Sequence, residues 1–222
     1  MNATLSERAI ILAPRGRDAD IAGAILREAA IDSVTALALP QLVKELHAGA
    51  AFALVTDDAL AGADLRGIAG FLQAQGEWSD FPFILLTERG GSIERNPAAG
   101  RYLELLGNVT FLERPFHPTS LISAAKAALR GRRRQYDART RLEEIREGAQ
   151  QLRVALAAGK LGAWSFDLAA MRLDASKDCK AQYGLRAEDD FTYDDLIACV
   201  HPDDRELMKS EIRRSLATGA DY

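Results

Sequence analysis

Five short apolar runs occur in the first 130 residues, and amphipathic segments separate them. Each run is too short for a helix and is bounded by polar or turn-forming residues, which is typical of strands buried in a parallel sheet. Between the runs, apolar residues recur at intervals of three and four, as in helices that cover one face of a sheet. This alternation predicts an α/β fold with a doubly wound, five-stranded parallel sheet. The predicted strands are Ala9–Leu12, Ser33–Leu37, Phe52–Thr56, Phe83–Thr87 and Val109–Leu112.

The helix expected before the fifth strand carries an internal break. Asn96 and Pro97 lie within the segment Ile93–Leu106, and proline cannot donate the backbone hydrogen bond of a helix interior. We therefore expect this helix to be the least regular of those around the sheet.

Residues 119–158 have a different pattern, with few strand formers and no strong helix breaker after Pro118. Apolar or small side chains recur here every three or four residues without a change of register, which predicts one long helix. The repeat is most apolar from residue 142 onward, so we expect this part to form a parallel, dimeric coiled coil. The alternative interpretation is an amphipathic helix packed against its own domain. The expected dimerisation positions are Leu142, Ile145, Ala149, Leu152 and Leu156.

Residues 159–222 combine aromatic and acidic side chains. Two short segments, 162–167 and 171–174, predict a β-hairpin, and three helical pieces follow between residues 177 and 216. Two strands cannot bury the face of a sheet well by themselves. We therefore expect a partial α+β domain, whose remainder is missing from this sequence.

Composition and charge narrow the class of protein. Apolar residues make up 48% of the 222 residues and charged residues 27%, as in ordinary globular domains. The formal charge of −4 argues against a general nucleic-acid-binding protein, and no apolar run approaches the roughly 20 residues needed to cross a bilayer. We expect a cytoplasmic protein that contacts neither membrane nor nucleic acid and holds no cofactor and no metal. Its expected parts are a first domain over 1–130, a coiled-coil helix over 131–158 and a partial domain over 159–222.

Several motifs resemble those of bacterial sensor proteins. Leu161–Trp164, Phe191–Tyr193 and His201–Arg205 resemble parts of the first half of a PAS domain. The five strands and their helices resemble the receiver domains of response regulators, whose fold is flavodoxin-like. In this order, the parts are similar to the N-terminal region of sensor histidine kinases of the His-Trp-Glu group, where a receiver-like domain and a PAS domain precede the kinase core. Further segments that carry the resemblance are Trp78–Pro82, Leu106–Thr110 and Arg132–Tyr136.

The resemblance implies a site at the ends of the strands. A working receiver accepts a phosphoryl group on an aspartate after strand three, and Asp57 stands at that position. Thr87 matches the hydroxyl position after strand four, and Phe111 matches the switch aromatic on strand five. Arg114 replaces the family's lysine and keeps its charge, although a guanidinium is a planar fork rather than a point donor. The resemblance also implies a cis peptide bond between Arg114 and Pro115.

The acidic pair that holds Mg²⁺ in working receivers is replaced in this chain. Phosphoryl transfer needs a divalent ion that bridges the phosphoryl oxygens, and such an ion takes several oxygen ligands. Strand one instead runs into Ala13–Arg17, whose two arginines would repel a metal. The nearest acids, Asp18 and Asp20, are expected on the first helix. We therefore expect Asp57 to be a structural acid that Arg114 or helix N-termini neutralise.

The expected function is regulatory. The chain is interpreted as a sensory module of a two-component histidine kinase, which forms a homodimer through the long helix and relays a signal to a downstream kinase core or response regulator. The alternative is a functional receiver that is phosphorylated at Asp57. A third interpretation starts from the basic run Arg130–Arg134 and predicts an RNA-binding antiterminator with a C-terminal three-helix module, but the region of Trp164 and Phe191 lacks that pattern. We expect the basic run to be a solvated face of the helix between the domains.

Overall fold

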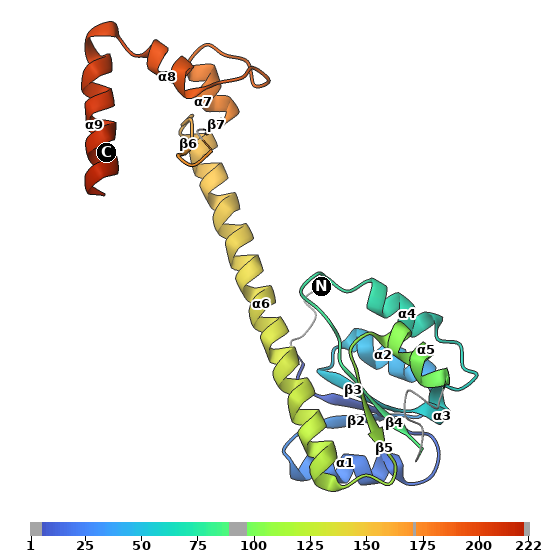
Figure 1. The fold of residues 1–222 in the computed structure, drawn as a ribbon. Helices are drawn as coiled ribbons and strands as arrows, with labels where there is room; N and C mark the ends of the chain where they lie inside the picture. Colours follow the sequence, from blue (N-terminus) through green and yellow to red (C-terminus); the bar gives the residue numbers. More distant parts are fainter. Residues whose placement is uncertain (1–5, 89–96, 171, 220–222) are drawn as a thin grey trace. The chain divides into compact units, whose positions relative to one another are not determined.

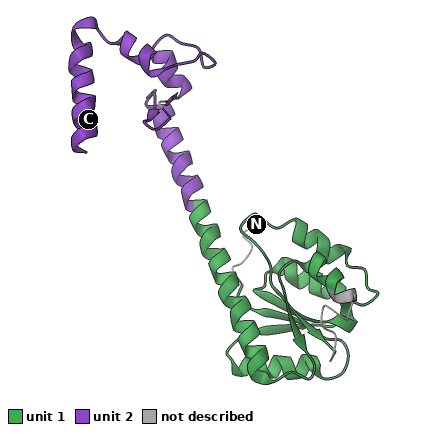
Figure 2. Cartoon of the chain, viewed as in Figure 1, with its two compact units in different colours: residues 1–143 green, residues 144–222 purple. Residues whose placement is uncertain are grey.

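The structure, a computed structural model, describes residues 6–88, 97–170 and 172–219. The chain divides into two compact units, 1–143 and 144–222, which Figure 2 shows in different colours. Within the described ranges, no helix has both the length and the apolar character needed to cross a membrane.

A five-stranded sheet forms the centre of unit 1 (Figure 1). Its strands are β1 (Ala9–Leu12), β2 (Ser33–Ala36), β3 (Phe52–Thr56), β4 (Phe83–Thr87) and β5 (Val109–Glu113). All strand pairs are parallel, in the order β2-β1-β3-β4-β5. This is the doubly wound order of flavodoxin-like and receiver folds, so the predicted fold class is confirmed for this unit. The strands β1, β3 and β4 are buried along their whole length, which explains their continuous apolar sequence.

Helices cover both faces of this sheet. They are α1 (Asp18–Glu28), α2 (Leu39–Ala48), α3 (Asp57–Leu60), α4 (Arg66–Gln73), α5 (Pro97–Leu106) and α6 (Pro118–Ala158). On one face, Leu42 of α2, Ile68 of α4 and Leu106 of α5 belong to one buried cluster. On the other face, Leu26 of α1 and Leu121 of α6 belong to a second cluster. The sheet is therefore the middle layer of three, with an apolar core on each side.

The helix α5 begins at the proline that was expected to interrupt it. Pro97 is its first residue, a position where the missing N–H would have had no partner within the helix. Residues 93–96, also predicted in this helix, lie outside the described residues.

The first half of α6 packs on unit 1, and this changes the expected domain division. Leu121 and Ala125 are fully buried on the face of the sheet that α1 also covers. Farther along the helix, Arg132 and Tyr136 are buried as well. Unit 1 therefore continues to Glu143 instead of ending at residue 130. This half of the helix follows the alternative interpretation, an amphipathic helix packed against its own domain.

Unit 2 contains an antiparallel hairpin and short helices. The predicted hairpin is confirmed: β6 (Trp164–Asp167) pairs with β7 (Arg172–Ala175), and Phe166 lies opposite Leu173. Residue 171, also predicted in the hairpin, lies outside the described residues. A small core forms around Leu173, Cys179 and Phe191. The remaining elements are α7 (Lys177–Gln182), α8 (Tyr193–Cys199), the 3₁₀ helix η1 (Pro202–Asp204) and α9 (Arg205–Thr218).

Candidate functional site

The carboxyl ends of β1, β3 and β5 bring charged side chains together. Asp18 begins α1 after β1, Asp57 begins α3 directly after β3, and Arg114 follows β5. The connections reverse direction between β1 and β3, and in open α/β sheets such a switch point is where ligands bind. These side chains therefore lie where this fold usually carries its functional site.

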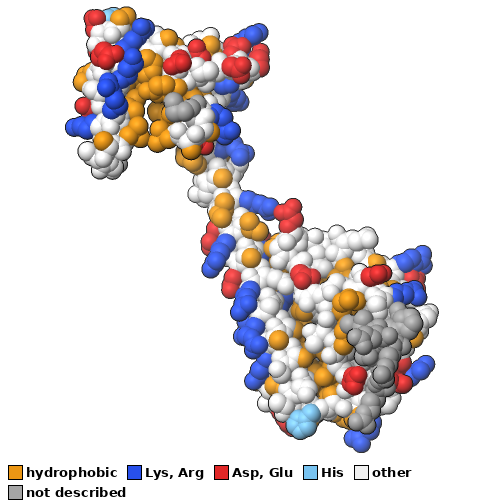
Figure 3. All heavy atoms as spheres, viewed as in Figure 1, with side chains coloured by type: hydrophobic (Ala, Val, Ile, Leu, Met, Phe, Trp, Pro, Cys, Tyr) orange, Lys and Arg blue, Asp and Glu red, His pale blue; other side chains and the backbone are white. Residues whose placement is uncertain are grey.

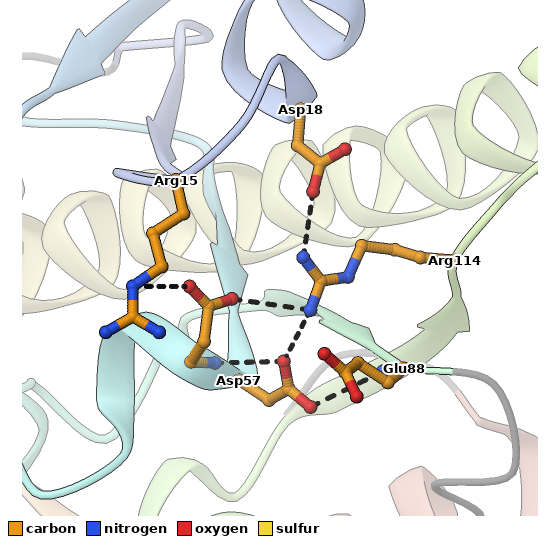
Figure 4. Close-up of polar contacts among 6 residues, drawn as sticks. Arg15, Asp18, Asp57, Glu88 and Arg114 are labelled. Carbon is orange, nitrogen blue, oxygen red and sulfur yellow. Dashed lines mark hydrogen bonds and ion pairs between the residues drawn. The ribbon is translucent and has the colours of Figure 1, made fainter.

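The guanidinium of Arg114 lies at the centre of this cluster (Figure 4). Its Nη1 donates a hydrogen bond to Oδ2 of Asp18 at 2.8 Å. Its Nη2 donates to Oδ1 of Asp57 at 2.8 Å and to Oδ1 of Asp58 at 3.3 Å. One cation thus joins three carboxylates that come from the first turns of two different helices.

Asp57 also accepts hydrogen bonds from the backbone. The N–H of Asp58 donates to its Oδ1 at 2.9 Å, and the N–H of Glu88 donates to its Oδ2 at 3.4 Å. Arg15 adds a second positive charge, because its Nε lies 3.8 Å from Oδ2 of Asp58. Both carboxylate oxygens of Asp57 are therefore engaged within the chain.

Burial and charge act in opposite directions on Arg114. Burial favours loss of the proton, but the hydrogen bond to Asp18 and the negative charges of the three carboxylates favour keeping it, and the pKa of Arg114 is raised above its ordinary value. The charge of this cluster also acts on Tyr102 of α5. Burial, and then the charge of Asp57, raise the pKa of its hydroxyl. The cluster therefore contains a permanent cation that belongs to the chain.

This arrangement pairs the carboxylates with guanidinium groups of the chain. The oxygens of Asp18 and Asp57 that would turn toward an ion instead accept hydrogen bonds from guanidinium nitrogens. Among the described residues, no group of three or more His, Cys, Asp or Glu side chains is placed to hold a metal. Asp18 and Asp57 thus engage a planar guanidinium through oxygens that a hard ion, which takes several oxygen ligands, would need.

The structure brings together some of the positions that the resemblance singled out. Asp57 and Arg114 are in direct contact, and the carbonyl of Thr87 accepts a hydrogen bond from the N–H of Arg114 at 2.7 Å. Phe111 instead packs, half-buried, on the face of the sheet that α2, α4 and α5 cover. The peptide bond between Arg114 and Pro115 is cis, as the resemblance implies.

Two members of the cluster were not assigned from the sequence. Asp18 lies on the first helix, as expected, but its pairing with Arg114 joins residues 96 positions apart in the chain. Asp58 directly follows Asp57. Two consecutive acidic residues at the start of a helix could have indicated that both carboxylates belong to the cluster at this end of the sheet.

The basic run 130–134 is not a solvated face throughout, and that prediction is wrong for Arg132. Only 6% of Arg132 is exposed. Its Cζ lies 5.2 Å, 5.3 Å and 4.8 Å from the ring centroids of Trp78, Phe81 and Tyr136. Charge patterning along the run could not reveal this, because the aromatic partners of the cation are mostly far away in the sequence.

The predicted dimerisation positions are mostly exposed along α6. Leu142, Ile145 and Leu152 are 39%, 69% and 61% exposed, Ala149 is exposed, and Leu156 is half-buried. Their alternating spacing of three and four places them on one stripe of the helix. Dimerisation itself stays a prediction.

Comparison with solved structures returns receiver domains of low sequence identity. A response regulator receiver protein from Sinorhizobium medicae is 13% identical, with a TM-score of 0.44, over 57% of this chain and 97% of its own. A signal receiver domain of an HD domain-containing protein from Pseudomonas fluorescens is 12% identical, with a TM-score of 0.47, over 58% and 98%. A CheY-like receiver domain protein from Methanospirillum hungatei is 14% identical, with a TM-score of 0.48, over 59% and 98%. No protein-family profile and no curated protein sequence matches the chain. The fold class is defined by the strand order and register described above.

Proposed function

We propose that the chain is the regulatory, sensory part of a two-component histidine kinase, and that its receiver-like unit works without phosphorylation. The observation that carries the proposal is the guanidinium of Arg114 among Asp18, Asp57 and Asp58. In a working receiver, a divalent ion bridges the phosphoryl group and neutralises developing charge. Arg114 supplies positive charge from the chain itself, so the carboxylates are already paired before a phosphodonor arrives. The proposed partner is a downstream kinase core or response regulator.

A functional phosphoacceptor receiver is the second candidate. It is supported by the position of Asp57 directly after β3 and by the 19% exposure of its side chain. If the Arg114 side chain turned away, three carboxylates would remain at one end of the sheet as oxygen ligands. The two candidates differ in one property, which is whether the intact chain binds Mg²⁺ together with a phosphoryl mimic.

Titration with beryllofluoride and Mg²⁺ separates these candidates. We expect no saturable change in the melting temperature of the wild-type chain. Arg114→Ala, which frees the three carboxylates, should gain a Mg²⁺-dependent stabilisation, and adding Asp57→Asn should remove it. Arg66→Ala, which removes an exposed arginine paired with Asp64, should behave as the wild type. Saturable binding of beryllofluoride to the wild type that is lost in Asp57→Asn would establish the phosphoacceptor instead.

We further propose that the chain forms a parallel homodimer through the stripe Leu142, Ile145, Ala149, Leu152 and Leu156. The proposal is supported by large apolar side chains that stay exposed at coiled-coil spacing in the single chain. A supercoiled partner helix would remove this surface from water, which is the main source of stability in such helices.

A matched pair of substitutions tests the stripe. Leu152→Ala should weaken dimerisation, because truncating a leucine that the dimer buries typically costs about 2–5 kcal/mol. Val154→Ala is the control, since Val154 is also exposed (57%) but lies outside the stripe. Sedimentation equilibrium of both variants measures the difference. A wild-type chain that remains monomeric at high micromolar concentration would exclude the dimer.

We also propose that unit 2 is the first half of a PAS domain that binds no ligand of its own and is completed by a neighbouring protein surface. An apolar groove of about 570 Å³ in this unit supports the proposal, and its lining includes Trp164, Phe166, Leu196 and Ile212. Figure 3 shows apolar side chains around a hollow in unit 2. Limited proteolysis should cut unit 2 of the isolated chain well before unit 1. A protease-resistant, monomeric unit 2 with a bound flavin or haem would contradict this.

A further inference from the structure

A second cavity lies at the opposite end of the sheet from Asp57. It has a volume of about 220 Å³, and its walls come from the ends of α2 and α4, from the segment before β4 and from α6. Because Ala50 and Ser79 in this lining precede β3 and β4, the cavity belongs to the amino ends of the strands. The side chains that matter here are His47, Phe71, Trp78, Arg132, Tyr136 and Arg139.

Arg132 is a buried cation, and no acid among the described residues forms a salt bridge with it. Its Nη1 donates to Oγ of Ser79 and to Oε1 of Gln135, both at 2.7 Å, so both protons of this nitrogen are used. Its Nε is buried and has no hydrogen-bond partner among the described residues. Removing a cation from water is costly unless charges or hydrogen bonds replace the solvent. Arg132 therefore places a positive charge with no acidic partner among the described residues in the lining of the cavity.

The rest of the lining adds a second arginine and aromatic surface. Arg139 also stacks on Trp78, with its Cζ 5.2 Å from the ring centroid. Its salt bridge goes to Glu143 at 2.8 Å, a residue that is not part of the lining. The His47 ring meets Phe71 edge-on at 5.4 Å. None of the described residues that line the cavity is an Asp or a Glu.

The aromatic wall is held in place by its own contacts. Gln75 accepts hydrogen bonds from Oγ of Ser79 at 2.6 Å and from the N–H of Phe81 at 3.1 Å, which fixes the segment between them. The indole of Trp78 lies so close to Gly76 that a Cβ there would come within 2.6 Å of Nε1. Tyr136 donates from its hydroxyl to the carbonyls of Ser6 and Ala50. The cavity is therefore largely formed before any ligand arrives.

We propose that this cavity binds a small carboxylate with a planar aromatic body. Arginine is suited to carboxylates because its donors match their geometry and because it is weakly hydrated. The rings of Phe71, Trp78 and Tyr136 match a flat apolar body better than an inorganic anion. The volume lies below the range of about 300–1,000 Å³ typical of drug-sized ligands, which limits the ligand to a small molecule. The site is independent of the Asp57 cluster and gives the chain an input that needs no phosphoryl transfer.

The test uses benzoate as the probe and benzamide as its uncharged counterpart. Isothermal titration of the full chain should show saturable binding of benzoate, and benzamide and acetate should each bind at least about tenfold more weakly. Arg139→Gln should weaken benzoate binding several-fold. The matched control is Arg134→Gln, an exposed arginine on the same helix that should leave binding unchanged. Fluorescence of Trp78 in a Trp164→Phe background provides a second readout, because the chain has two tryptophans.

Three results would overturn the proposal. The first is the absence of saturable benzoate binding to the wild-type chain up to about 10 mM. The second is equal binding of benzoate and benzamide, because the cation would then play no part. The third is inorganic phosphate that binds as tightly as benzoate, because the aromatic body would then be irrelevant. These arms use the wild-type chain and do not depend on whether an Arg132 variant folds.

Discussion

Two arginines of unit 1, Arg114 and Arg132, carry a partly or fully buried charge, and their surroundings stabilise it by different means. Arg114 lies at the carboxyl end of the sheet and pairs with three carboxylates. Arg132 lies at the amino end among three aromatic rings and two neutral acceptors. The first environment cancels the charge, whereas the second leaves it in place. The comparison shows that the charge of a buried guanidinium can be paired within the chain in one environment and left for an external anion in another.

The chemistry of the partners explains this difference. Carboxylates bind guanidinium by charge and hydrogen bonds together, so little remains for an external anion. Aromatic faces attract a cation through their quadrupole but carry no net charge. Ser79 and Gln135 are likewise neutral acceptors. The charge of Arg114 is consequently paired within the chain, whereas that of Arg132 is surrounded by packing without a paired carboxylate among the described residues. In hydrogen bonding the two are alike in one respect, because the Nε of each is buried without a partner in the described part of the chain.

The largest effect is expected for Arg132→Ala. It removes two hydrogen bonds and the stacking on three rings, so the free energy of unfolding of unit 1 should fall by about 2–4 kcal/mol. Urea unfolding followed by Trp78 fluorescence in the Trp164→Phe background measures this. Arg132→Met should lose less than Arg132→Ala, because the longer apolar side chain fills part of the space between the rings that alanine leaves empty. A loss equal to that of Arg134→Ala would show that the rings do not hold the cation.

Arg114→Ala should have the next largest effect, a loss of about 1–3 kcal/mol at neutral pH. The substitution leaves Asp18, Asp57 and Asp58 close together without their shared cation. Salt screens the repulsion between these carboxylates, so the deficit relative to the wild type should shrink as the ionic strength is raised. Thermal unfolding at low and high salt provides the measurement. A deficit that does not change with salt would mean that Arg114 acts through packing rather than charge.

Gly76→Ala should have a smaller effect. The free energy of unfolding should fall by about 1–2 kcal/mol, because the new methyl group collides with the Trp78 ring. The substitution should shift the fluorescence maximum of Trp78 and lower the melting temperature. Gly70→Ala is a fitting control, since a Cβ at this position in α4 meets no atom within 4 Å. The control should be neutral or slightly stabilising. Equal behaviour of the two variants would show that Gly76 does not support the wall of the cavity.

The smallest effect is expected at the surface pair of Glu7 and Arg133. The hydrogen bond from Arg133 holds the pKa of Glu7 below its ordinary value. A carboxylate with a lowered pKa stabilises the fold above its unfolded pKa and loses this contribution as the pH falls through its folded pKa. Glu7→Gln should therefore narrow slightly the stability difference between neutral and acidic solution. Salt should suppress the effect, because exposed pairs are screened. An effect that does not depend on salt would indicate that Glu7 contributes to stability by something other than its charge.

The fold could be predicted because the sequence signals of its strands are local. The sites could be predicted only in part, because they depend on contacts between residues far apart in the sequence. The central strands β1, β3 and β4 are recognisable as short apolar runs, since a strand buried on both faces must be apolar throughout. The edge strands β2 and β5 are only partly buried, and their runs are correspondingly more mixed. Asp57 and Arg114 could be assigned through the resemblance to receiver domains, whose functional positions follow strands three and five. The aromatic cage of Arg132 required contacts with Trp78 and Phe81, which lie about fifty residues earlier in the sequence. No periodicity encodes a pairing of that kind.

The cation that neutralises the Asp57 cluster is covalently part of the chain. Its local concentration is set by the backbone around β5 and does not follow mass action in the surrounding solution. A bound ion leaves when a chelator or dilution lowers its concentration, but the guanidinium of Arg114 cannot be titrated away in this manner. The cluster therefore keeps the same electrical state through changes of ionic composition, until a rearrangement of the chain itself withdraws the side chain.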